Sequence, residues 1–78
     1  MKLLVISPTG NLFEGEVQRV LLPGAKAPFV VLRGHAPLIS SLAEGKMGYT
    51  RVDGTEGEIA LSGGFVEVKD EEIVVCTE

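Results

Sequence analysis

The stretch Leu61–Val68 (LSGGFVEV) places two adjacent glycines between short runs that favour β-structure. A glycine-rich segment can cradle a phosphate, but such a loop opens a helix whose N-terminal amides hold the anion. Here β-forming residues follow the glycines. Because glycine lets a backbone bend sharply or approach a neighbour closely, we predict a bulge or kink at Gly63 and Gly64. Strands over Glu58–Ser62 and Phe65–Lys69 flank this kink.

The same pattern of short β-branched runs between turn signals extends along the whole chain. No window carries apolar residues at the helical i, i+3, i+4, i+7 spacing for long enough to form a helix. Further strands are predicted over Lys2–Ser7, Leu12–Leu22, Ala27–Leu32, His35–Leu42, Lys46–Val52 and Glu72–Thr77. Turn signals separate them at Pro8–Asn11, Pro23-Gly24, Arg33-Gly34, Glu44-Gly45, Asp53–Gly57 and Asp70-Glu71. Roughly eight short strands are typical of a β-sandwich or a small barrel.

Length and charge bound the function. With 78 residues there is room for one domain, residues 1–78, and one modest core, so the chain gains much from a partner. The net charge of −4 argues against nucleic acid or an anionic membrane as the main partner. Pro8 and Gly10 cut off the N-terminal apolar run before it could form a secretory signal or a membrane span. Cys76, the one cysteine, has no disulfide partner. We expect a cytoplasmic soluble protein.

His35, the only histidine, is the residue most open to a chemical interpretation. A zinc site needs three or four ligands, usually with paired spacing, and the single cysteine lies far from it in sequence. Nucleophilic catalysis is not indicated, because Ser40, Ser41 and Ser62 lack a Gly-x-Ser-x-Gly elbow. We therefore predict no catalytic residue, metal site or cofactor, and we interpret His35 as a structural residue beside the turn at Gly34.

Lys46 offers one chemical alternative. Gly45–Gly48 (GKMG) places a lysine before a methionine between two predicted strands. This resembles the modified-lysine hairpin of biotinyl and lipoyl carrier domains, although the residue before the lysine matches neither family. Three hypotheses therefore remain: an interaction protein, a carrier domain modified at Lys46, and a small β-domain that binds a free ligand.

Apolar residues on both faces of the predicted strands favour an interaction protein. Leu4 and Ile6 alternate with Leu3 and Val5, and Pro37 and Ile39 alternate with Leu38. A strand that is apolar on both faces is covered on both, either by its own domain or by a partner. In the longest predicted strand the alternation places Phe13, Val17 and Leu21 on one face.

Four groups of residues together resemble the epsilon subunit of the F-type ATP synthase. They are Phe13–Val17 (FEGEV), Leu22–Gly24 (LPG), Gly34–Leu38 (GHAPL) and Leu61–Val68. The resemblance covers essentially the whole chain, and GHAPL with SGGFVEV is far more specific than either motif alone. It implies an antiparallel β-sandwich of two packed sheets with about eight to ten short strands.

The resemblance implies a non-catalytic rotor subunit of the central stalk. Such a subunit binds the gamma subunit, contacts the c-ring and couples proton- or sodium-driven rotation to ATP synthesis on other subunits. It is a peripheral subunit at the cytoplasmic face of the energy-coupling membrane and meets the membrane only through the complex. Family members commonly continue into two C-terminal helices that can bind ATP or inhibit hydrolysis, so a chain that stops at Glu78 is expected to lack that regulation.

The ring-contacting loop of the family includes the segment before and within GHAPL. Family members often carry an acidic or glycine-rich turn and a proline there, and this chain has Ala27–Val30 and Arg33 instead. The candidate subunit-interface residues are Pro28, Phe29, Arg33, His35, Pro37, Leu38 and Ile39. The candidate structural turns are Gly34, Gly63 and Gly64.

Overall fold

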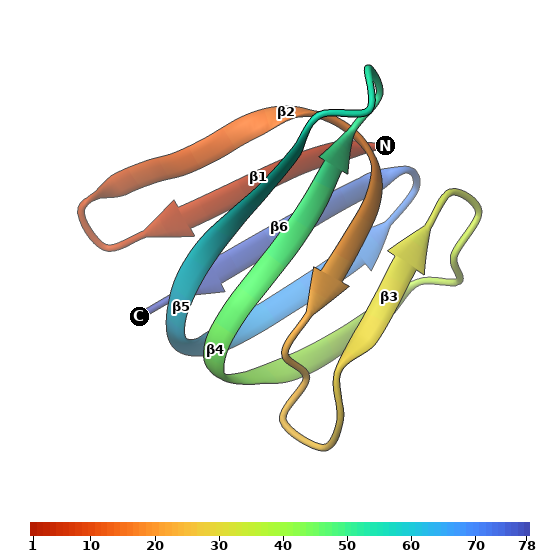
Figure 1. Ribbon diagram of the computed structural model, residues 1–78. Coiled ribbons are helices and arrows are strands. Elements are labelled where there is room, and N and C mark those ends of the chain that lie inside the picture. The colour runs from red at the N-terminus through yellow and green to blue at the C-terminus, as the bar shows by residue number, and fades with distance from the viewer.

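The computed structural model describes every residue from Met1 to Glu78 and contains six strands and no helix (Figure 1). The strands are β1 (Lys2–Ser7), β2 (Gly10–Leu22), β3 (Phe29–Leu32), β4 (Leu38–Arg51), β5 (Glu56–Lys69) and β6 (Glu72–Thr77). Their order is β1-β6-β5-β4-β2-β3, and β1 also pairs with β2. The all-β sandwich class is confirmed. Nothing helical in the structure has the length and apolar content that crossing a membrane requires.

The predicted number of eight to ten short strands is wrong, because three strands are long and serve both layers of the sandwich. β2 has 13 residues and β4 and β5 have 14 each. The predicted break at Glu44-Gly45 lies inside β4, where Glu44 pairs with Ser62 of β5. Because the two strands curve together from one layer into the other, their antiparallel pairing continues on both sides of the bend (Figure 1).

The pairings define the two layers. The first, which we call the β3 layer, consists of β3, residues 17–22 of β2, residues 44–51 of β4 and residues 56–62 of β5. The second, the β6 layer, consists of residues 38–42 of β4, residues 64–69 of β5, β6, β1 and residues 10–16 of β2. All neighbours are antiparallel except β1 and β6, which are parallel.

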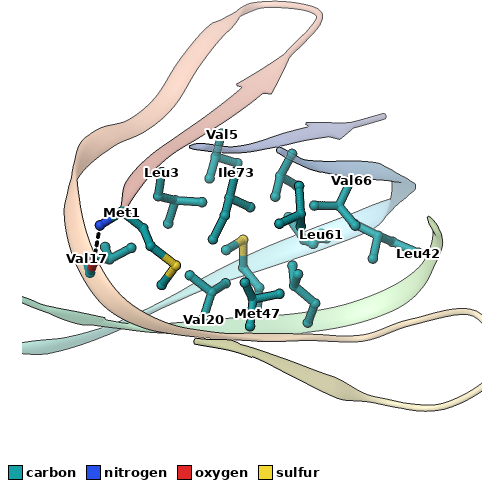
Figure 2. Close-up of a cluster of buried hydrophobic side chains, with 14 residues drawn as sticks. Met1, Leu3, Val5, Val17, Val20, Leu42, Met47, Leu61, Val66 and Ile73 are labelled. Atoms are coloured by element: carbon teal, nitrogen blue, oxygen red, sulfur yellow. Dashed lines mark hydrogen bonds between the residues drawn. The ribbon is translucent and has the colours of Figure 1, made fainter. Parts of the chain in front are cut away.

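The hydrophobic core lies between these layers (Figure 2). In β1, Leu3 and Val5 point inward between exposed or half-buried neighbours, as period-two alternation requires. Fourteen buried residues form the cluster: Met1, Leu3, Val5, Val17, Val20, Leu22, Val31, Leu42, Met47, Leu61, Val66, Val68, Ile73 and Val75.

β2 does not keep one alternation along its length. Its pairing with β4 shifts between Val17 and Arg19, so Val17 and Val20 both point into the core. The prediction that Leu21 shares a face with Val17 is therefore wrong, and Leu21 is exposed. A bulge of this kind inserts one residue and reverses which residues face the core beyond it.

The bend of β5 depends on Gly63 and Gly64, whose φ angles are +102° and +122°. A Cβ atom at Gly64 would overlap the backbone carbonyl oxygen of Cys76 in β6. Next to the bend, the Ser62 amide donates to Thr77 Oγ1 at 3.1 Å. On the β4 side, the Ala43 amide donates to the carbonyl oxygen of Pro23 at 2.7 Å. Partners outside the β4–β5 ladder thus satisfy backbone groups where the two strands change layers.

Gly64→Ala is expected to destabilise the chain by about 3 kcal/mol or more, because the side chain would meet backbone and the φ angle is unfavourable for an L-residue. Gly48→Ala is the matched control, since its Cβ would lie 3.9 Å from the Gly57 carbonyl oxygen and 4.0 Å from Leu21 Cβ. Urea unfolding measures both variants. Equal midpoints for the two would contradict this account of the bend.

Candidate interaction surface

The loop from Arg33 to Pro37 connects β3 to β4 and contains the only histidine. Gly34 has a φ of +83°, and the His35 amide donates to the Leu32 carbonyl oxygen at 3.1 Å, which closes the turn. His35 Nδ1 lies 2.7 Å from the Ala36 carbonyl oxygen. Because a carbonyl oxygen only accepts, Nδ1 carries the hydrogen in this arrangement. The hydrogen bond of the ring thus lies within its own loop. No group of three or more potential metal ligands surrounds the ring.

The seven candidate interface residues do not form one compact cluster. Pro28 and Phe29 lie at the start of β3, where the hollow that they line also contains Ile39. Pro37, Leu38 and Ile39 line a second hollow together with Glu67–Lys69 of β5. Ile39 borders both hollows and is 73% exposed. Leu38 packs partly against the core.

Arg33 and His35 lie at the other end of β3. There the β3–β4 loop faces the β5–β6 turn, and Arg33 Nε is 3.5 Å from Glu71 Oε2. His35 and Gly34 line a small crevice together with Met1 and residues 71–73. We call the whole strip from Pro28 to Ile39 along β3 and its two loops the loop edge.

A second feature is apolar and spans four strands of the β6 layer. Cross-strand pairing places Leu4 beside Val74, and Ile6 beside Cys76. Cys76 in turn pairs with Phe65, which is 50% exposed. Ile39 lies diagonally from Phe65, since it pairs with Glu67, two residues from Phe65 in β5, and Glu67 separates Ile39 from Val74. We call this surface the outer apolar face: Leu4, Ile6, Ile39, Phe65, Val74 and Cys76.

Sequence reasoning identified only part of this face. It singled out Leu4, Ile6 and Ile39 but missed Phe65 and the β6 residues. A signal for Phe65 was present, because it alternates with buried Val66 and is therefore in phase with exposed Glu67. Finding the β6 contribution required the register between β1 and β6, which are distant in the chain.

The opposite outer surface, on the β3 layer, is mixed: exposed Leu21 and Leu32 lie among polar and charged side chains. A shallow groove there is bordered by Arg19, Thr50, Glu56 and Glu58, and its floor is formed in part by glycines. Lys46 lies on the same side, with Nζ 4.0 Å from Glu58 Oε1.

The hairpin position that a carrier domain gives its modified lysine is not found at Lys46. Lys46 pairs with Ala60 well inside β4, because Glu44-Gly45 bends the strand rather than ending it. The hypothesis of a carrier domain modified at Lys46 therefore loses the local structure on which it depended.

Asp53, in the β4–β5 turn, is the carboxyl whose pKa the fold lowers. The Thr55 amide donates to Asp53 Oδ1 at 2.9 Å, and this bond contributes most to lowering the pKa. The Thr55 side chain and the charge of Arg51 act in the same direction. Gly54, with a φ of +91°, completes the turn.

Asp53→Asn tests this turn through pH. The folded pKa lies below the usual value of 3.8, so the ionised carboxylate stabilises the fold above that value. This contribution is lost as pH falls through the folded pKa. Wild type should therefore exceed the variant in unfolding midpoint at about pH 7 and lose that advantage at a pH below the folded pKa of Asp53. A difference that stays constant between the two pH values would contradict the assignment.

Comparison with known proteins agrees with this geometry. A family model described as "ATP synthase, Delta/Epsilon chain, beta-sandwich domain" matches residues 1–78. An "ATP synthase epsilon chain" from Desulfitobacterium hafniense (strain DSM 10664 / DCB-2) is 45% identical over 76 residues, which are 97% of this chain and 57% of that protein. An "ATP synthase epsilon chain" from Chlorobium limicola is 36% identical over 77 residues, 99% of this chain and 88% of that protein. The chain thus spans a little over half of the first relative.

Two solved assemblies contain chains with the same fold. In the Euglena gracilis mitochondrial ATP synthase (OSCP/F1/c-ring), the matching chain has a TM-score of 0.89 at 23% identity, covering 96% of this chain and 48% of that one. In the central stalk and c-ring of the Tetrahymena thermophila mitochondrial ATP synthase, the TM-score is 0.79 at 19% identity, covering 99% and 62%. At these identities the likeness concerns the fold.

Proposed function

Because this chain belongs to the delta/epsilon chain family of the ATP synthases, we propose that it is a non-catalytic rotor subunit that binds the gamma subunit and contacts the c-ring. In this role it couples ion-driven rotation of the ring to ATP synthesis on other subunits. It is then a peripheral subunit at the cytoplasmic face of an energy-coupling membrane.

The outer apolar face is the observation that carries the proposal. A 78-residue domain has little apolar surface to spare, yet it leaves Phe65 and Ile39 exposed on one face of one sheet. The patch is apolar except for exposed Glu67, which lies between Ile39 and Val74. An apolar patch with charged residues around it is typical of a protein interface. Lys2, Glu14 and Glu72 lie on the same side and supply such a rim. We assign the gamma subunit to this face.

The loop edge is assigned to the c-ring. It carries the candidate interface residues Pro28, Phe29, Arg33, His35, Pro37, Leu38 and Ile39, and most of their side chains are exposed. Ile39 belongs to both surfaces, so the two partners would meet the domain along a shared border. Exposed aromatic and apolar residues together with an arginine are enriched at protein interfaces.

Rotation requires that a force applied at the loop edge reach the outer apolar face without loss. β4 begins at the loop edge with Leu38 and continues through Met47 in the core. Along its length it is hydrogen-bonded to β5, which carries Phe65. The two proposed contacts are therefore joined by paired backbone instead of a flexible linker.

Co-expression with the gamma subunit of the same organism tests the proposal. Wild type is expected to co-purify, and Ile39→Lys is expected to weaken binding about tenfold or more, because a charge would be buried in an apolar contact. Isothermal titration of the purified partners measures the difference.

Val52→Lys is the matched control. Val52 is also apolar and is 64% exposed, and it lies in the β4–β5 turn, outside the outer apolar face to which gamma is assigned. It lines a hollow with Arg33 of the loop edge, so it serves as a control for gamma binding only. It should leave binding unchanged, and both variants should keep the wild-type unfolding midpoint. If wild type never associates with gamma, the proposed function fails; if both lysine variants bind equally well, the surface assignment fails.

A further inference from the structure

The turn between β5 and β6 has an unusual backbone for its sequence. Asp70 and Glu71 have φ angles of 50° and 64°, and they are the only non-glycine residues in the chain with positive φ. Lys69 pairs with Glu72 across the turn, so these two residues form a two-residue hairpin loop. Glycine is preferred at the second position of such a loop because a side chain there is strained.

The Glu71 side chain has contacts that a glycine would lose. Its Oε2 lies 3.5 Å from Arg33 Nε in the β3–β4 loop and 3.9 Å from the amino group of Met1. The backbone carbonyl oxygen of Glu71 accepts a hydrogen bond from the Lys2 amide at 2.8 Å, a contact that a glycine would keep. Asp70 has the same strained backbone but no ion pair or side-chain hydrogen bond. Of the two strained residues, only Glu71 therefore makes side-chain contacts that a glycine would lack.

Arg33 is the only residue of the loop Arg33–Pro37 whose side chain forms a hydrogen bond or an ion pair with another part of the fold. The remaining polar contacts of the loop are internal: the His35 amide to Leu32, and the His35 ring to Ala36.

We propose that Glu71 is a positioning residue whose carboxylate holds Arg33, and through it the loop Arg33–Pro37, in the orientation used at the loop edge. That the orientation serves partner binding rests on the proposed function; that the loop is held by Glu71 does not. The ion pair is exposed, with side-chain exposures of 82% for Arg33 and 49% for Glu71. Its effect is therefore local and sensitive to salt, and it adds little to the stability of the whole fold.

Backbone relaxation and amide exchange in the isolated 78-residue chain test the clamp. Glu71→Gly relieves the turn, so the unfolding midpoint should stay equal or rise. The His35 amide should nevertheless exchange about two- to fivefold faster, and the loop should become more mobile. Glu71→Gln, which removes only the charge, should loosen the loop similarly. Both differences should fade in about 0.5 M salt.

Asp70→Gly is the matched control, because it relieves the same kind of backbone strain and leaves the Glu71 carboxylate in place. It should leave the loop unchanged. Arg33→Glu should loosen the loop, and combining it with Glu71→Arg should restore wild-type exchange. The clamp is overturned if Glu71→Gln leaves the loop amides unchanged, if Asp70→Gly loosens them equally, or if the exchanged pair gives no rescue.

Titration with the gamma subunit and with purified c-ring separates the two proposals. If wild type binds the c-ring, Glu71→Gln should weaken that binding about two- to fivefold at an unchanged unfolding midpoint, and the exchanged pair should restore it. Unchanged binding by Glu71→Gln would overturn the link between the clamp and partner binding. If wild type binds neither partner, the proposed function fails, and the exchange experiment alone decides the clamp.

Discussion

Gly64 lies so close to the carbonyl oxygen of Cys76 that no side chain fits between them, and the architecture depends on this contact. Because β5 can approach β6 there with a positive φ, one strand belongs first to the β3 layer and then to the β6 layer. β4 remains paired with β5 and follows the same bend. The core residues of both layers therefore project from shared strands, and the layers cannot separate without breaking backbone pairing.

Local sequence signals were enough for the fold class but not for the number of strands. The paired glycines, the short β-branched runs and the turn residues each act over a few neighbours, and they correctly indicated an all-β fold, either a sandwich or a small barrel. The choice of a sandwich came from the family resemblance. Whether Glu44-Gly45 ends a strand or bends one depends on Ser62 and Leu61 across the ladder, which local patterns do not contain. The same limit explains Leu21, whose exposure follows from a register shift between β2 and β4.

The interaction surface was predictable only where the alternation of side chains along a single strand reveals an apolar outer face. Leu4, Ile6 and Ile39 stand out because apolar residues occupy both faces of their strands. That they join Phe65, Val74 and Cys76 in one face follows only from the parallel register of β1 with β6 and the antiparallel register of β5 with both neighbours. Arg33 and Glu71 are 38 residues apart, and neither shows by itself that it has a partner.

In the proposed assembly, stiffness and compliance lie in different parts of this small domain. β4 and β5 link the border at Ile39 to the core through continuous pairing, so this path can transmit a force without deforming. The loop Arg33–Pro37 lies outside the ladders, and one exposed ion pair ties its side chains to the rest of the fold. Such a tie is weak enough to yield when a partner requires a different loop shape, yet it limits the conformations that the free loop samples. A rotor contact built this way combines the rigid paired strands β4 and β5 with a loop that can change its conformation. The Glu71 carboxylate limits the conformations of that loop, and it does so from a position where the backbone alone would favour glycine.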